Sequence, residues 1–338
     1  MNTLVLAPFS DPSLADLQSW GNVAYEPWTQ TQMLHDPEEL GARLETERFN
    51  TLIVEADFLL EELFTAAPSL QVAAICRAAL NQVDLEAATE QGVVVLHTPG
   101  RNAQAVAELV LGHMLALARQ IPSASHYVAH GQWEDPTEPY TRFQGRELAG
   151  ATLGVMGLGQ IGKRVTRMAR AFGMRVLAHD PYVKHGDRRT KGIELARLDE
   201  LLAGSDFVSI HIPDTSATAG MLGKQQLSLM KPTAYLVNVT SAAVVDQQAL
   251  ASALTEGRLA GAALDVYESH PIAPDSPFLH LPNGGIANVI LTPHIGGATI
   301  ETIDRHSAMV IADLRRYAAG IRPKHLANPA VWRTRRRL

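Results

Sequence analysis

The sequence lacks several features that would point to particular classes of protein. Only one of its 338 residues is a cysteine, Cys76, which excludes an internal disulfide and fits a reducing compartment. No apolar run approaches the ~18 residues that a membrane-spanning helix needs. Basic residues are not in excess, because 29 Lys and Arg against 35 Asp and Glu give a net charge of −6. This balance argues against a general nucleic-acid or membrane-surface binder.

The two ends of the sequence carry no strong targeting signal. The start, MNTLVLAPFSDP, has no basic region before its short apolar run and is typical of a first buried strand rather than a signal peptide. We therefore expect a cytoplasmic protein. The end, RTRRRL, predicts a solvated terminus; a binding arm for an anionic partner is the less favoured interpretation.

Short apolar runs alternate with helical patterns along most of the chain. This alternation predicts α/β units built around parallel sheets. The dense apolar pattern of residues 102–121 predicts a long buried helix, and residues 298–319 predict a final amphipathic helix. The polar segment 122–150 between the two regions predicts an exposed, irregular arm. The expected strands are TLVLAP, NVAYEPW, TLIVEA, QVAAIC and GVVVLH in the first third, and DFVSIHIP, AYLVNVT, GAALDVY and VILTPHI later.

A glycine-rich turn, GLGQIG, follows the apolar run TLGVM and precedes a helical pattern. In this context Gly157 permits a tight turn, Gly159 lets backbone amides approach a pyrophosphate, and Gly162 lets the helix pack closely on the strand. Asp180 ends the next apolar run, MRVLAHD, where a carboxylate can accept hydrogen bonds from the ribose hydroxyls of NAD and would repel the 2′-phosphate of NADP. The sequence therefore predicts an NAD site, with a glycine turn in an unliganded domain as the alternative.

Seven segments together resemble the D-isomer-specific 2-hydroxyacid dehydrogenases, a family that includes phosphoglycerate dehydrogenases and glyoxylate reductases. The likeness extends over essentially the whole chain, and the segments stand in the order that the family has. They are HTPGRNAQAVAELVLGHMLALAR (97–119), GRELAGATLGVMGLGQIGKRV (145–165), HDPYV (179–183), HIPDT (211–215), LVNVTSAAVVD (236–246), GAALDVYESHP (261–271) and LTPHIGGAT (291–299).

The resemblance implies an α/β fold of two doubly wound parallel-sheet domains, with the active site in the cleft between them. Residues 1–100 and 297–338 would form a flavodoxin-like domain that binds a small-molecule substrate. Residues 101–296 would form an inserted Rossmann domain that binds NAD. The resemblance also implies a homodimer built on the Rossmann domains, with an arm at about 121–149 reaching over the partner.

Individual residues inherit expected roles from this resemblance. His294 in TPHIGG matches the acid/base histidine, and a neutral imidazole can take up a hydroxyl proton near neutral pH. Asp265 in LDVYE matches the aspartate that holds the nicotinamide amide. The positions expected to contact the cofactor are Gly157, Gly159, Gln160, Ile161, Gly162, Asp180, His211, Pro213, Val239, Asp265, His294 and Gly296.

Two positions that carry the family's chemistry hold other residues here. The arginine of the usual N-x-S-R-G run is replaced by Ser241, and the glutamate that partners the histidine is replaced by His270. A guanidinium grips a carboxylate with two charge-assisted bonds, whereas a serine hydroxyl offers one neutral donor. Losing the glutamate removes a group that fixes the tautomer of the histidine and favours its protonated form. We expect His294, His270 and Ser241 to be the catalytic residues.

The loop expected to cradle a substrate carboxylate also departs from the family pattern. It reads CRAALNQVD, with Ala78 and Ala79 where glycines are expected, and with Arg77 beside them. Arg77 could supply a replacement charge, although a surface role is favoured. These three residues are the expected substrate-binding positions.

Four functions remain open at this point. The first is an NAD-dependent oxidoreductase that acts on a CH–OH group of a non-standard substrate, with His270, Ser241 or Glu268 assisting His294. The second is an NAD(H)-binding regulator or corepressor-like protein without dehydrogenase activity. The third is an ordinary D-2-hydroxyacid dehydrogenase that uses a substitute arginine, such as Arg77 or Arg101. A zinc site made of two histidines is the weakest, because no third ligand is evident.

Overall fold

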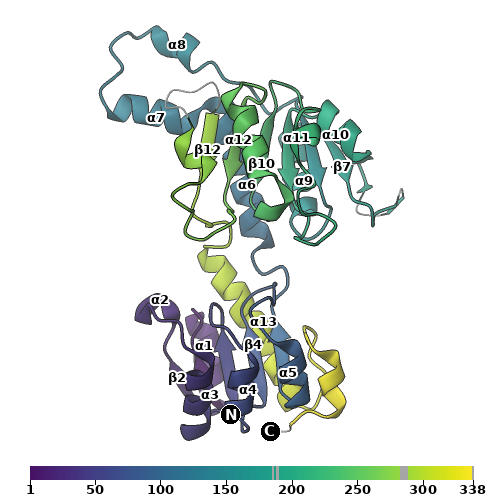
Figure 1. Cartoon of the computed structure of the whole chain (residues 1–338). Coiled ribbons are helices and arrows are strands. Elements are labelled where there is room, and N and C mark those ends of the chain that lie inside the picture. Colours follow the sequence, from purple (N-terminus) through teal and green to yellow (C-terminus); the bar gives the residue numbers. More distant parts are fainter. Residues whose placement is uncertain (185, 188–189, 282–287, 337–338) are drawn as a thin grey trace. The chain divides into compact units, whose positions relative to one another are not determined.

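The computed structural model describes residues 1–338 except 185, 188–189, 282–287 and 337–338. The chain divides into two compact units, which are described separately: unit 1 is Met1–Arg101 with Thr299–Leu338, and unit 2 is Asn102–Ala298. Each unit is built on one parallel sheet with helices on its faces (Figure 1). The predicted α/β class with two doubly wound parallel sheets is confirmed.

Unit 1 contains a five-stranded parallel sheet in the order β2-β1-β3-β4-β5. This is the flavodoxin-like order, in which the chain reverses direction along the sheet after β1 and β2. Its strands are β1 Asn2–Val5, β2 Asn22–Tyr25, β3 Thr51–Val54, β4 Val72–Ile75 and β5 Val94–His97. Its helices are α1 Asp11–Gln18, α2 Trp28–Thr31, α3 Pro37–Thr46, α4 Glu61–Ala66, α5 Leu85–Glu90, α13 Ile300–Ala318 and the 3₁₀ helix η4 Pro329–Arg333.

Alternate side chains of these strands face two separate cores, as the two-residue period of a strand requires. Leu4 and Leu52 belong to the core covered by α3, α4 and α5. Val5 belongs to the core covered by α13, which contributes Val310 and Leu314. The C-terminal helix therefore helps to cover one face of a sheet that is formed entirely by the first hundred residues.

Unit 2 contains a seven-stranded parallel sheet in the order β12-β11-β10-β9-β6-β7-β8. From β6 the chain first adds strands on one side, β7 and β8, and then adds β9 to β12 on the other side. The strand order therefore reverses between the neighbours β6 and β9, as it does in the Rossmann arrangement. Its strands are β6 Thr152–Met156, β7 Arg175–His179, β8 Glu194–Leu195, β9 Phe207–Ile210, β10 Tyr235–Asn238, β11 Gly261–Leu264 and β12 Asn288–Leu291. Its helices are α6 Ala103–Arg119, α7 Ile121–Ala129, α8 Glu138–Arg142, α9 Gly162–Ala171, α10 Leu198–Gly204, α11 Lys224–Leu227, α12 Gln247–Thr255, and the 3₁₀ helices η2 Ala242–Val244 and η3 Pro277–His280.

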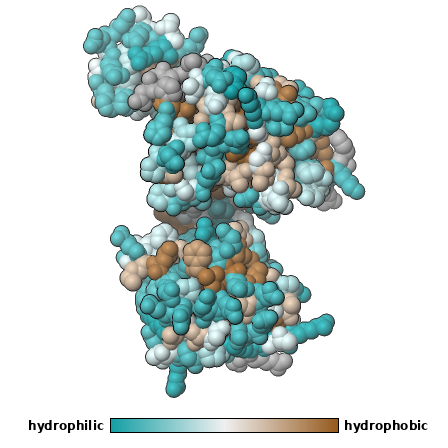
Figure 2. Space-filling model, viewed as in Figure 1, coloured by the Kyte–Doolittle hydropathy of each residue, from teal (hydrophilic) through white to brown (hydrophobic). Residues whose placement is uncertain are grey.

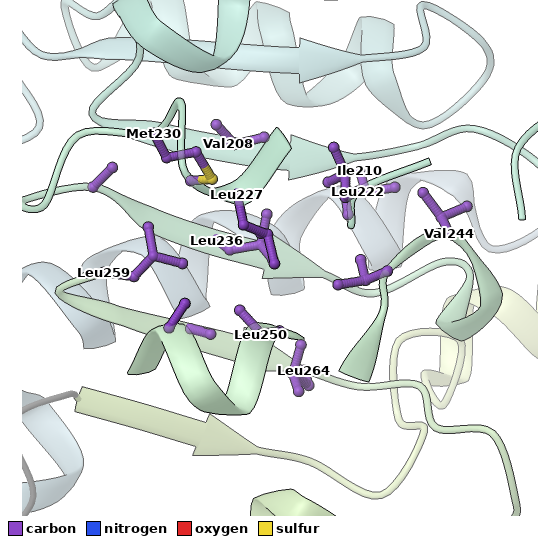
Figure 3. Close-up of a cluster of buried hydrophobic side chains, with 14 of the residues drawn as sticks. Val208, Ile210, Leu222, Leu227, Met230, Leu236, Val244, Leu250, Leu259 and Leu264 are labelled. Carbon is purple, nitrogen blue, oxygen red and sulfur yellow. The ribbon is translucent and has the colours of Figure 1, made fainter. Parts of the chain in front are cut away.

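One face of this second sheet packs against α10, α11 and α12 through a continuous apolar cluster. Figure 3 shows Leu236 of β10 and Leu264 of β11 beside Leu250 of α12. The other face packs against α6 and α9, for example through Val110 and Val165. Burial on both faces explains why the strands read as nearly continuous apolar runs.

Two expectations about local structure are wrong. The arm after residue 121 is not irregular, because it contains α7 and α8. The C-terminal tail is not simply solvated, because Arg336 is half-buried and its guanidinium donates to the carbonyl oxygens of Ala67 and Leu70. Arg335 lies over the ring of Trp332, and Arg337 falls outside the described residues. The several N–H donors of a guanidinium suit this docking onto backbone carbonyl oxygens.

Large hydrophobic residues are exposed on both units. Figure 2 shows brown and tan residues near the edge of unit 1 where α2 lies. Met33 and Leu34 after α2, and Phe58 after β3, are exposed residues of unit 1. No described helix meets the length and apolarity that a bilayer crossing requires.

Candidate active site and cofactor site

The glycine turn of unit 2 lies where the strand order reverses. Gly157 directly follows β6 and has a φ of +92°, which an L side chain rarely adopts. A Cβ at this position would lie 2.8 Å from the carbonyl oxygen of His211, which directly follows β9. The turn and the end of β9 are therefore in close contact at the crevice where such sheets bind dinucleotides.

The next two glycines of the turn differ in what surrounds them. A Cβ on Gly162 would collide with the carbonyl oxygen of Gly157, so this glycine lets α9 begin directly against the turn. A Cβ on Gly159 would meet no atom of the chain within 4 Å, so the space beside it is open. That open cradle at the start of α9 fits a pyrophosphate, which would receive backbone N–H groups and the positive end of the helix dipole.

Asp180 connects the end of β7 to the glycine turn. Its Oδ2 accepts a hydrogen bond from the backbone N–H of Leu158 at 2.8 Å, and its Oδ1 accepts one from Tyr182 at 2.9 Å. A carboxylate has about four acceptor positions, so two remain for the hydroxyls of a ribose. Asp180 therefore holds the turn and has capacity to bind a sugar as well.

His211 presents an unsatisfied polar atom at the same crevice. Its Nε2 lies 2.9 Å from the hydroxyl of Ser209, whereas its Nδ1 is buried and has no hydrogen-bond partner in the described part of the chain. Burial lowers the pKa of His211 to about 3, so the ring is neutral at physiological pH. A buried orphan nitrogen at this edge is consistent with a site that a cofactor completes.

The loop after β12 is held by a buried carboxylate. Asp265, which follows β11, is 0% exposed and accepts hydrogen bonds from the Thr292 hydroxyl at 2.6 Å, Ile295 N at 2.9 Å and Gly296 N at 2.7 Å. His294, between these donors, has a φ of 55°, in the left-handed region that costs a side-chain residue roughly 1–2 kcal/mol. The two amides bound by Asp265 directly follow His294, so this carboxylate stabilises the strained turn that presents the imidazole.

The structure brings His294 and His270 together. Nδ1 of His294 lies 3.0 Å from Nε2 of His270, a hydrogen-bond distance, and the ring centroids are 4.8 Å apart. Both side chains belong to exposed residues of unit 2, on the loops after β12 and β11. Glu268, two residues before His270, is also exposed.

Ser241 lies at the end of β10 and is 7% exposed. Its backbone is fixed by Asn238, which accepts from Ser241 N at 3.3 Å and donates to Ser241 O at 2.7 Å. Its hydroxyl oxygen is buried and has no hydrogen-bond partner in the described part of the chain. The side chain is therefore a small polar group whose bonding capacity is unused.

Comparisons with known proteins place the chain in a family. Residues 111–296 match the model of the D-isomer specific 2-hydroxyacid dehydrogenase, NAD binding domain. Over 320 residues, 94% of this chain and 91% of the relative, it is 34% identical to YoaD of Bacillus subtilis, which is provisionally named a 2-hydroxyacid dehydrogenase. It is 40% identical to the glyoxylate reductase of Korarchaeum cryptofilum over 81% of each chain.

The chain belongs to the D-isomer-specific 2-hydroxyacid dehydrogenase family. It is an NAD-dependent dehydrogenase by this membership, and the crevice of unit 2 has the features that NAD needs. Among solved structures it also resembles the acyclic imino acid reductase Bsp5 in complex with NADPH and D-Arg. That likeness has a TM-score of 0.80 and 26% identity, and covers 96% of this chain and 99% of the other.

The remaining cofactor positions expected in this dehydrogenase lie around the same crevice. Gln160 is exposed and Ile161 is half-buried, both between the turn and α9. Pro213 is exposed after β9, and its carbonyl accepts from the Thr218 hydroxyl at 2.7 Å. Val239, at the end of β10, is 5% exposed and belongs to the apolar core beside α6. Val239 therefore offers only a small apolar surface to a cofactor.

In unit 1 the two candidate substitute arginines differ in their partners. Arg101 lies 2.5 Å from a carboxylate oxygen of Glu55 and 2.6 Å from Nδ1 of the buried His306, so its charge is already neutralised. Arg77 is half-buried, and its guanidinium has no ion pair or hydrogen bond in the described part of the chain. Ala78 and Ala79, next to it, are exposed.

Several residues of these sites were not anticipated from the sequence. Thr292 bridges the site by donating to Asp265, with the buried His113 of α6 3.4 Å away, and burial lowers the pKa of His113. The sequence also did not predict the Glu55–Arg101–His306 network. The threonine adjoins the TPHIGG motif, which could have drawn attention to it. Among the described residues, no group of three His, Cys, Asp or Glu side chains is arranged to hold a metal ion.

Proposed function

We propose that the chain oxidises or reduces a CH–OH group of a substrate other than a standard small 2-hydroxy acid. The observation that carries this proposal is Ser241, a buried serine with an unused hydroxyl at the position where the family has its carboxylate-binding arginine. The cofactor machinery around the glycine turn has no comparable departure.

His294 is the proposed acid/base residue. When bound, NAD supplies the hydride acceptor, and the protein must supply a base for the hydroxyl proton. Asp265 pins the turn that presents His294, so the imidazole is held at a defined place relative to the end of β11. A positioned histidine of this kind typically contributes about 10²–10⁴-fold to the rate.

The replaced arginine determines which substrates are favoured. Removing one electrostatic stabiliser of a polarised carbonyl costs about 3 kcal/mol of barrier, roughly a hundredfold or more in rate. A substrate that needs no carboxylate clamp, such as a polyol-like alcohol, is penalised less. The likeness to Bsp5, named as an imino acid reductase, supports the idea that this architecture accommodates substrates other than 2-hydroxy acids.

A homodimer is the proposed assembly. Ile121 and Val128 of α7, and Trp133 and Tyr140 further along the arm, are exposed, with exposed fractions of 52%, 55%, 54% and 87%. Exposed large apolar and aromatic side chains gathered on one extended arm are typical of a protein interface. We propose that a second copy of this chain covers them, which sedimentation of the purified protein would test.

The test of the proposed activity is an NADH-formation assay on matched alcohols, polyols and 2-hydroxy acids. We expect turnover of a neutral alcohol or polyol with a higher kcat/KM than that of lactate or glycerate. His294→Ala should abolish it, whereas His130→Ala, which removes an exposed histidine from the arm, should not. Absence of turnover on the whole panel by a protein that still binds NADH would contradict the proposal.

A second candidate, a 2-hydroxyacid dehydrogenase with a substitute arginine, is favoured by one observation. Arg77 is half-buried without a counter-ion in the described residues, whereas Arg101 is occupied by Glu55. If Arg77 binds the substrate carboxylate, the chain reduces glyoxylate, and Arg77→Ala raises KM for glyoxylate by at least about tenfold, a loss of roughly 1.4 kcal/mol. Arg322→Ala, at an exposed arginine of unit 1, is the matched control.

A further inference from the structure

We propose that His270 is a positioning residue that also passes the substrate proton from His294 to water. The inference rests on the proposed acid/base role of His294. It concerns only the two loops after β11 and β12, which belong to the same unit.

The geometry provides a continuous path through two rings. Nδ1 of His294 and Nε2 of His270 are 3.0 Å apart, so one of the two nitrogens donates a hydrogen bond to the other. Each imidazole has a second ring nitrogen, which is chemically distinct from the one in this contact. His270 is an exposed residue, so solvent can reach its side chain.

The chemical difference from a carboxylate partner is what suggests a relay. A carboxylate accepts the Nδ1 proton of a histidine and stabilises the positive charge that develops on the ring. A neutral imidazole accepts at one nitrogen while donating at the other, so a proton that enters at Nε2 can leave at Nδ1. The pair can therefore deliver a proton to water without retaining a cation beside the reacting carbon.

The proton balance for oxidation of an alcohol is complete. The substrate C–H hydrogen leaves as hydride to NAD, and the O–H proton moves to Nε2 of His294. The Nδ1 proton of His294 moves to Nε2 of His270, and the Nδ1 proton of His270 moves to water. Both rings remain neutral with exchanged tautomers, and exchange with water restores them after the product leaves. Reduction uses the same steps in reverse.

The buried groups around the pair hold the two loops in place. Asp265 directs its oxygens to Thr292 and to the amides of Ile295 and Gly296. The Tyr267 hydroxyl donates to the carbonyl oxygens of Leu264 and Thr292, and its ring centroid lies 6.2 Å from that of His270. These residues fix the two loops that bring His270 and His294 to hydrogen-bond distance.

Two substitutions separate a relay from a purely structural contact. His270→Gln retains a side chain that can hydrogen-bond to Nδ1 of His294 but cannot pass a proton. We expect its kcat to fall on the order of tenfold, a modest share of the usual acid–base contribution, with NADH affinity unchanged. The kcat of His270→Ala should fall by a similar factor, and imidazole added to the buffer should restore turnover. Wild-type turnover in the Gln variant, or no response of the Ala variant to imidazole, would overturn the proposal.

A measurement without turnover distinguishes failure of the relay from failure of the proposed function. Nitrogen-15 NMR of the histidine rings in the cofactor-free protein reports which nitrogen of each ring carries the proton. We expect the His294 signals to change tautomer balance in His270→Ala and to remain unchanged in the arm variant His130→Ala. Unchanged His294 signals in His270→Ala would refute the pairing even if the enzyme turns over, whereas an inactive protein with coupled rings would refute only the activity.

Discussion

Replacing Asp265 by asparagine tests whether this carboxylate organises the active-site loop. Asp265 is fully buried, and its two oxygens accept three hydrogen bonds from the segment Thr292–Gly296. Asparagine has the same shape, but its amide nitrogen would face either the Gly296 N–H or the two donors bound by Oδ1. At least one acceptor is therefore converted into a donor that faces another donor.

The expected cost follows from these bonds. A hydrogen bond to a charged group is worth about 1.5–3 kcal/mol, and a buried donor left unsatisfied costs about 1–3 kcal/mol. Removal of a buried charge offsets part of this sum. We expect Asp265→Asn to lower the free energy of unfolding of unit 2 by about 3 kcal/mol and to weaken NADH binding, because the loop that carries His294 is released.

Urea unfolding and NADH titration measure the two effects separately. The matched control is Asp313→Asn in unit 1, where a buried aspartate also accepts three bonds, from Lys324 N, His325 N and His325 Nδ1. It should destabilise unit 1 by a similar amount and leave NADH affinity unchanged. The reasoning is refuted if Asp265→Asn is as stable as the wild type and binds NADH equally well.

Three further predictions concern the cofactor crevice. Gly159→Ala should fold with wild-type stability and lose NADH binding, because its Cβ meets no chain atom but fills the cradle, whereas Gly162→Ala should lose stability in thermal unfolding through collision with Gly157. Asp180→Ala should raise the Kd for NADH about tenfold, because roughly 1.4 kcal/mol of contact with the ribose is lost. The preference for NADH over NADPH should fall by about the same factor. Burial lowers the pKa of His211 from 6.5 to about 3, so the unfolded chain takes up a proton at this ring before the folded protein does. The contribution of His211 to the free energy of unfolding is therefore fully present above pH 6.5 and is lost as the pH falls toward 3. Wild-type unfolding free energy should therefore fall by up to about 4–5 kcal/mol more than that of His211→Asn over this window.

The fold class could be predicted because it depends on local patterns. The apolar runs and the glycine turn are contiguous in the chain, and so they reveal parallel strands and the place of Gly157, Gly159 and Gly162. The family resemblance also predicts that Ser241 and His270 stand where the family has an arginine and a glutamate. It could not show that His270 contacts His294, because that contact depends on where the loops after β11 and β12 end.

The parts that escaped prediction depend on long-range or marginal interactions. The Glu55–Arg101–His306 network joins residues separated by 46 and 205 positions, and none of the three stands in a motif that names its partner. Helix α7 was missed because it is short, has a proline at its second position and contains two serines, features that also fit a loop. Burial of the Ser241 hydroxyl without a partner is a property of packing and has no local signature.

The position of α13 has a consequence for synthesis of the chain on the ribosome. All five strands of unit 1 emerge within the first 97 residues, but α13, which covers one face of their sheet, follows only after residues 102–298. At roughly 5–20 residues per second this interval lasts about 10–40 s. During that time the cluster that contains Val5, Val72 and Val94 lacks the apolar side chains that α13 contributes to it. Chaperones that recognise exposed apolar strands would therefore have their longest opportunity to bind at this face, before translation of the last forty residues closes it.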